Sequence, residues 1–157
     1  MGTQIDNVYL GNPLLKKANV QQEFTKEQVL EFIACKNDPV YFAKQHVKIV
    51  SLDEGLVGFK PYDFQEKLIR NFHEHRFNIC KMPRQTGKST TSVSYLLHYA
   101  VFNDNVNIGI LANKAATARD LLGRLQTAYE NLPKWMQQGI ISRKKGSLEL
   151  ENGSKIL

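Results

Sequence analysis

The stretch over residues 77–99 constrains this chain most, because its pattern predicts a strand, a short loop and a helix in immediate succession. Apolar, β-prone residues run over 77–82 (FNICKM), the loop follows as PRQTGKST, and an apolar-periodic segment begins inside that loop. A loop that enters a helix at Gly87, Lys88 and Ser89 can turn backbone N–H groups toward one point, where the helix N-terminus adds partial positive charge. The stretch therefore predicts a phosphate-binding loop.

The loop matches the usual phosphate-loop pattern only in part. That pattern is Gly, four residues, then Gly-Lys-Ser/Thr, and Met82 stands at the first glycine position. Lys88 is expected at the β- and γ-phosphates of a nucleotide, and the Ser89 hydroxyl at Mg2+. Three residues alone occur by chance in ordinary loops, so the flanking strand and helix are what favour ATP with Mg2+. The expected nucleotide-binding residues of the loop are Gln85, Thr86, Gly87, Lys88, Ser89 and Thr90.

Positive charge is concentrated in the second part of the chain. The formal net charge is +6, yet residues 1–60 carry seven basic and seven acidic side chains, against fourteen and eight in the remainder. Some of this excess would face the phosphates of a nucleotide. The rest, including Lys114, Arg119 and the basic run 143–145, suits either a track for double-stranded DNA or an ordinary solvated face.

Cysteine content and hydropathy place limits on the type of protein. Cys35 and Cys80 are far apart and have no metal-ligand spacing, so both are predicted to be reduced and buried. The sequence contains neither the apolar core of a signal peptide nor an apolar run of membrane-span length. A soluble, intracellular protein with no membrane partner is the expectation.

The first 60 residues are predicted to pack around the nucleotide site rather than to form it. Residues 1–24 show no sustained period, which is typical of an extended or partly ordered arm. A capping-box pattern at Thr25 opens one helix, and Asp38, followed by proline, opens a second. Residues 25–60 are therefore expected to form a helical lid or packing subdomain.

Residues 61–157 are predicted to be the front part of an ATPase core. We expect a helix over 61–76, a buried parallel strand over 106–112, a further helix capped by Asn113, and a β-hairpin turning at Asn-Gly 152–153. Strand, loop, helix, strand and helix in this order predict an α/β fold of the P-loop NTPase type, with three layers and a mainly parallel sheet. The pattern stops in a strand, so the fold is expected to be incomplete at its C-terminal side.

Gln65 is a candidate for recognising the base of a nucleotide. It lies on the helix before the loop and has Tyr62 and Phe64 as aromatic neighbours. An amide offers a donor and an acceptor together, as the Hoogsteen edge of adenine requires. A glutamine on an amphipathic helix is more often simply solvated, and both readings stay open at this point.

Five segments together resemble a known family: YDFQ (62–65), ICKMPRQTGKST (79–90), IGILANKAATARDLL (108–122), LPKWM (132–136) and SLELENGSKI (147–156). They are similar to the N-terminal ATPase portion of the large terminase subunit of T4-like tailed bacteriophages. A phosphate loop written Arg-Gln-x-Gly-Lys-Ser/Thr is typical of terminases, and it also accounts for the missing first glycine. The resemblance covers nearly the whole chain and is weaker before Phe24.

The resemblance implies a DNA-packaging motor that uses ATP and Mg2+ to drive double-stranded DNA into a procapsid. It further implies the portal protein and the small terminase subunit as partners, a ring oligomer on the portal, and the host cell cytoplasm as location. Lys88 and Arg84 become the catalytic residues, with Arg84 as an arginine finger on the γ-phosphate, for which a structural ion pair is the alternative. Ser89 would hold Mg2+, and Gln65 with Phe64 would contact adenine.

Hydrolysis in that family needs an acidic pair at the end of a later strand, and no apolar run after the loop ends in Asp-Glu. Asp53 and Glu54 follow IVSL but precede the loop. The chain is therefore expected to bind nucleotide without turning it over at the rate of a motor. Two other classes remain: a fragment of a DNA helicase or restriction-type translocase, and a non-catalytic basic module that binds nucleotide or DNA.

Overall fold

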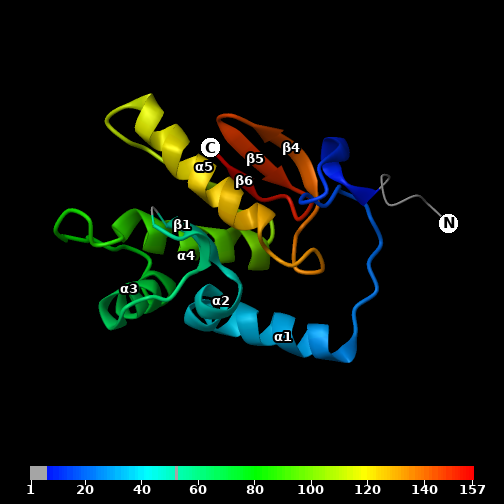
Figure 1. The fold of residues 1–157 in the computed structure, drawn as a ribbon, viewed down its shortest axis with the longest axis horizontal. Helices are drawn as coiled ribbons and strands as arrows, with labels where there is room; N and C mark the ends of the chain where they lie inside the picture. Colours follow the sequence, from blue (N-terminus) through cyan, green and yellow to red (C-terminus); the bar gives the residue numbers. More distant parts are fainter. Residues whose placement is uncertain (1–6, 52) are drawn as a thin grey trace.

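The computed structural model describes residues 7–51 and 53–157, which form a mixed α/β fold (Figure 1). Helices α4 and α5 lie in the middle of the view, with α1–α3 on one side and β4–β6 on the other. In the described residues no helix is both long and apolar enough to cross a bilayer. The elements in chain order are a 3-10 turn (Tyr9–Gly11), α1 (Lys26–Asn37), α2 (Pro39–His46), β1 (Lys48–Ser51), β2 (Gly55–Gly58), α3 (Asp63–Glu74), α4 (Lys88–Phe102), β3 (Asn107–Ile108), α5 (Ala115–Glu130), β4 (Ile140–Lys144), β5 (Ser147–Leu150) and β6 (Lys155–Ile156).

The strands form two small sheets, and the prediction of one mainly parallel sheet is wrong. β1 and β2 make an antiparallel hairpin of their own. The second sheet has the order β3-β6-β5-β4, in which β3 and β6 run parallel while both other pairs are antiparallel. The three strands after α5 follow one another through tight turns, and strands joined in that way pair antiparallel. The mixed α/β class is confirmed.

The strand predicted before the phosphate loop is not formed in the structure. Residues 77–82 run without strand pairing, the Ile79 side chain is fully exposed and Phe77 is 83% exposed. Cys80 is exposed as well, so the prediction that it is buried is wrong. β-prone residues form a strand where neighbouring strands supply hydrogen bonds and cover, and this segment has neither among the described residues.

The strand predicted over 106–112 is much shorter than expected. Only β3 has strand pairing, parallel to β6, and Leu111 beyond it is 92% exposed. A hydrogen bond from Ile110 N to Leu157 O (2.8 Å) continues the alignment by one step. The apolar composition predicted a strand at this place, but composition gives no information on how many of its residues pair with a neighbouring strand.

Both N-terminal helices begin where their capping residues predict. At α1 the Thr25 hydroxyl accepts from Gln28 N (3.2 Å) and the Gln28 side chain accepts from Thr25 N (3.1 Å), a complete capping box. At α2 the Asp38 carboxylate accepts from Val40 N (2.8 Å) and Tyr41 N (3.2 Å). The predicted helix starts are confirmed because these caps are local features of the sequence.

The Asn-Gly turn between β5 and β6 is also confirmed. Gly153 has φ +79°, a left-handed conformation that glycine adopts without strain. The Asn152 side chain donates to Ala100 O (2.9 Å) and Asn103 O (3.0 Å) at the end of α4. The turn therefore ties the sheet to the helix that begins at the phosphate loop.

The region predicted as an N-terminal arm contacts the sheet over part of its length. Residues 1–6 lie outside the described residues. Further along, Lys17 pairs with Ile140 at the start of β4, and Leu15 is buried at 2% exposure. The core that these residues join lies between α2, α4, α5 and the sheet, and its largest members include Phe42, Leu97, Leu125, Tyr129, Leu148 and Ile156.

Candidate functional site

The turn before α4 has the backbone geometry of an anion-binding loop. Gln85 (φ +60°) and Gly87 (φ +72°) both adopt left-handed conformations. Gly87 is the N-cap residue of α4, and no side chain caps the first turn of that helix. The first N–H groups of a helix have no intrahelical partner and carry partial positive charge, so an uncapped N-terminus favours an anion.

Gly87 is also the point at which the loop touches α3. The Gln65 side chain, only 4% exposed, donates from Nε2 to Thr86 O (3.1 Å) and accepts at Oε1 from Tyr62 N (2.9 Å). A Cβ atom on Gly87 would lie 2.4 Å from Gln65 Nε2. Gln65 thus holds the loop against α3, and its contact with adenine stays a prediction.

The Lys88 ammonium lies inside the curve of the loop. Its Nζ donates to Met82 O (3.0 Å) and to Pro83 O (2.6 Å), and the Thr86 hydroxyl also donates to Pro83 O (3.0 Å). An ammonium has three donor hydrogens, so one remains for an incoming anion. The sequence predicts Lys88 at the phosphate groups, and the structure places its ammonium against the carbonyls of Met82 and Pro83 in the same loop.

The remaining predicted residues differ in their exposure. Arg84 is exposed and forms no ion pair within residues 7–51 and 53–157, so the alternative of a structural ion pair finds no partner there. Gln85 and Ser89 are exposed on the turn and on the first turn of α4. Thr90 is half-buried and lines a different hollow, described below.

A shallow hollow of about 400 Å3 lies beside the loop. Phe64 forms one wall, and its ring stacks with Tyr62 at 5.9 Å and 9° between ring planes. Lining of this kind, mostly apolar with a few polar groups, suits a flat organic ring. Lys67, Leu68 and Asn71 of α3 also line the hollow and were not predicted as site residues. They follow Phe64 by three, four and seven residues, so they lie on the same face of the helix. The lining residues are Phe64, Lys67, Leu68, Asn71, Met82, Pro83 and Thr86.

A second, larger hollow of about 940 Å3 lies between β1, α4, α5 and the β4–β5 turn. Its wall has basic groups from Lys48, Arg119, Arg124 and Lys145. Within the part of the chain that the structure describes, only Arg124 among them has an ion-pair partner, Asp120, at 3.0 Å. Basic groups around one concave surface attract polyanions. The basic side chains make this hollow a candidate surface for a polyanion.

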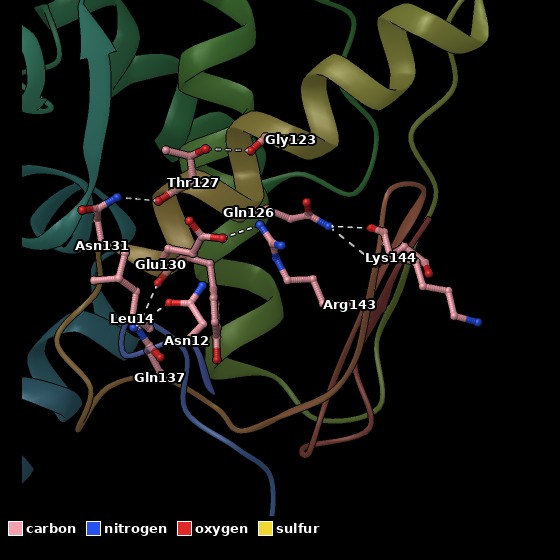
Figure 2. A network of polar contacts seen from close by, with 12 residues as sticks. Asn12, Leu14, Gly123, Gln126, Thr127, Glu130, Asn131, Gln137, Arg143 and Lys144 are labelled. Carbon is pink, nitrogen blue, oxygen red and sulfur yellow. Dashed lines mark hydrogen bonds and ion pairs between the residues drawn. The ribbon is translucent and has the colours of Figure 1, made fainter. Parts of the chain in front are cut away.

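In the basic run 143–145, one residue forms an ion pair and the other two are exposed. Figure 2 shows Arg143 facing Glu130, with which it forms an ion pair, and Gln126 donating to Lys144 O (3.0 Å). The side chains of Lys144 and Lys145 are exposed. Arg143 therefore joins β4 to α5, while the two lysines remain available to a partner.

The structure thus brings the predicted loop residues together at one helix N-terminus and adds an apolar hollow next to them. Gln65 and Phe64 reach the same place from α3, as the sequence proposed, and Thr90 lies on another surface. No protein-family model matches the chain.

Proposed function

We propose that this chain is the ATP-binding part of a viral DNA-packaging motor, a large terminase that couples ATP hydrolysis to the movement of double-stranded DNA into a procapsid. One observation carries the proposal: α4 begins without a side-chain cap at left-handed Gly87, with the Lys88 ammonium beside it. A nucleotide phosphate needs this arrangement of donors. The Arg-Gln-x-Gly-Lys-Ser pattern over residues 84–89 supports a terminase through the resemblance.

The residues of the loop fit ATP with Mg2+. The ion would neutralise phosphate charge, and the exposed Ser89 hydroxyl is the group that would hold it. Lys88 would exchange its contacts with loop carbonyls for phosphate oxygens, which are stronger acceptors because they are charged. Arg84 is exposed within the loop and has no ion-pair partner in residues 7–51 and 53–157, so it would be able to approach a γ-phosphate. Phe64 would cover the base, and Gln65 would keep the loop in place.

Double-stranded DNA is the partner that we propose for the basic hollow between α5 and the β4–β5 turn. Three of its cations, Lys48, Arg119 and Lys145, have no ion-pair partner in the described ranges 7–51 and 53–157. Contacts of this kind with phosphates give binding that weakens steeply with salt. The portal protein, the small terminase subunit, the ring oligomer and the location in the host cytoplasm belong to the proposal through the terminase resemblance alone.

A binding experiment separates the packaging motor from the other classes. Fluorescence anisotropy would compare a labelled DNA duplex with the matching single strand, at several salt concentrations, with and without Mg-ATP. A packaging motor predicts preference for the duplex, and Arg119→Ala should weaken that binding, whereas Lys36→Ala, an exposed change on α1, should not. Preference for the single strand would favour the helicase class, and duplex binding without any binding of ATP would favour the non-catalytic module.

A further inference from the structure

Three metal-ligating side chains meet where α1 packs against α2, away from the proposed nucleotide loop in the sequence. Glu31 and Cys35 are four residues apart and so share one face of α1, and His46 is the last residue of α2. One ligand atom of each lies within 4.8 Å of the other two. Glu31 Oε1 is central: it lies 2.8 Å from His46 Nε2 and accepts from Cys35 Sγ at 3.7 Å.

We propose that Glu31, Cys35 and His46 form a zinc-binding site. Thiolate, imidazole and carboxylate are the three protein ligands of Zn2+, with a sulfur distance of about 2.3 Å and nitrogen and oxygen distances of about 2.0–2.2 Å. In a tetrahedral site these lengths separate the ligand atoms by about 3.3–3.6 Å. The distance of 3.7 Å between Cys35 Sγ and Glu31 Oε1 is already close to this range. Glu31 Oε1 and His46 Nε2, which lie 2.8 Å apart, would have to separate by about half an ångström.

The surroundings hold the three ligands in place and leave one approach. The Tyr41 hydroxyl donates to Glu31 Oε2 (3.0 Å), which orients the carboxylate in the way that outer groups orient metal ligands. Cys35 is completely buried, whereas the side chains of Glu31 and His46 are 29% and 14% exposed. The Trp135 ring lies edge-on to His46 at 6.2 Å. An ion can therefore enter from the Glu31 side and take a water molecule as its fourth ligand.

Binding changes the cluster in a defined way. The Cys35 S–H bond breaks, its proton passes to solvent, and the sulfur binds zinc as a thiolate. His46 binds as neutral imidazole through Nε2, the nitrogen that now faces Glu31. The ion would join α1 to α2 by three bonds. It would thereby stabilise the helical region on which α4 packs.

An ion pair between Glu31 and His46 is the competing interpretation of the same contacts. It explains the 2.8 Å contact but assigns no part to the sulfur of Cys35, which lies against the same carboxylate oxygen. The two interpretations differ in one measurable respect. A zinc site binds metal through sulfur, and an ion pair does not.

Titration with Co2+, which takes the place of Zn2+, tests the proposal in the full chain without nucleotide. Thiolate ligation gives an ultraviolet charge-transfer band and tetrahedral geometry gives intense visible bands, so sulfur can be identified as a ligand directly. We expect one Co2+ per chain, displaced by Zn2+, and a rise in melting temperature with Zn2+ because the metal binds the folded state. His46→Gln should weaken zinc binding at least about tenfold, and Cys35→Ser should abolish the charge-transfer band.

Matched controls come from the same chain. Cys80→Ser removes the exposed cysteine, and His75→Gln removes an exposed histidine; both should leave the spectrum and the affinity unchanged. The His46 side chain is 14% exposed whereas Cys35 is completely buried, so His46→Gln keeps the test decisive if Cys35→Ser fails to fold. A spectrum without the sulfur band, a band lost in Cys80→Ser, or zinc affinity unchanged in His46→Gln would overturn the proposal and leave an ion pair.

Discussion

Gly87 is the residue on which the geometry of the loop depends most. An alanine there would be strained by the left-handed φ of +72° and would place its Cβ 2.4 Å from Gln65 Nε2. We expect Gly87→Ala to lower the free energy of unfolding by about 1–2 kcal/mol and to weaken ATP binding at least about tenfold, because alanine is strained at this φ and displaces the Gln65 amide that holds Thr86 O. Urea unfolding and titration with a fluorescent ATP analogue measure the two effects.

The control for this prediction is Gly146→Ala, in the turn between β4 and β5. A Cβ at Gly146 meets no atom within 4 Å, and its φ is not in the left-handed range. Both measured quantities should stay close to those of the unchanged protein. Equal ATP affinity in Gly87→Ala and Gly146→Ala would show that the loop conformation has no part in binding.

His98 gives the protein a predictable dependence on pH. Burial lowers its pKa to about 4, and its Nε2 faces the carbonyl of Cys35 at 2.9 Å, with the His73 ring 5.9 Å away. Between pH 4 and the ordinary value of 6.5, the unfolded chain binds the proton and the folded chain does not, so stability falls as pH falls. The loss from pH 7 to pH 5 is about 2 kcal/mol.

Urea unfolding at pH 7 and pH 5 checks this prediction. The comparison is with His98→Gln, which has no titrating group at this position, so the difference between the two pH values should shrink by about 2 kcal/mol whatever the substitution does to stability itself. An undiminished difference in His98→Gln would mean that other groups carry the pH dependence.

At the scale of elements, the turn between β5 and β6 is held by Asn152. Its side chain donates to Ala100 O and Asn103 O and accepts from Ser154 N (3.1 Å). We expect Asn152→Ala to cost about 2 kcal/mol, because the two carbonyls at the end of α4 lose a donor. Thermal unfolding measures the loss, and Asn113→Ala, at an exposed position, should cost much less. Similar losses for both would contradict this account of the turn.

Helices were more predictable in this chain than strands, although α5 begins at Ala115 with Lys114 as its N-cap residue, so the predicted cap by Asn113 is wrong. The capping box at Thr25, the Asp38 cap and the Asn-Gly turn at 152–153 act over a few residues, so the sequence shows them directly. A strand needs partners that are distant in the sequence. Residues 77–82 have the composition of a strand but no strand partner among the described residues. The strand β4, which pairs antiparallel with β5, was not predicted.

The candidate site shows the same contrast. The sequence placed Gly87, Lys88 and Ser89 at the start of a helix because the entry of a loop into a helix is a local pattern, and α4 does begin there. The role of Gln65 in holding Thr86 depends on a packing contact between α3 and the loop, 21 residues apart, which no local pattern reveals. The hollow beside Phe64 likewise depends on how α3 lies against the loop.

At the scale of the whole molecule, the structure separates the proposed nucleotide site from the proposed DNA surface. The loop and its hollow are formed by α3, the turn and the start of α4, whereas the basic hollow is formed by β1, α5 and the β4–β5 turn. Helix α4 connects the two places. It begins at Lys88 in the loop, and two residues of its first turns, Thr90 and Val93, line the basic hollow. The proposed nucleotide site and the proposed DNA surface therefore share one helix.

Calorimetric titration of ATP with Mg2+ into the chain and into Lys88→Ala, with Lys145→Ala as the matched control, tests whether the loop binds a nucleotide. We expect binding that is lost or at least about a hundredfold weaker in Lys88→Ala, because a charged contact to phosphate is removed, and unchanged in Lys145→Ala. Turnover should be slow in all three proteins. Equal binding in Lys88→Ala and the unchanged protein, or no binding in either, would contradict the assignment of this loop to a nucleotide.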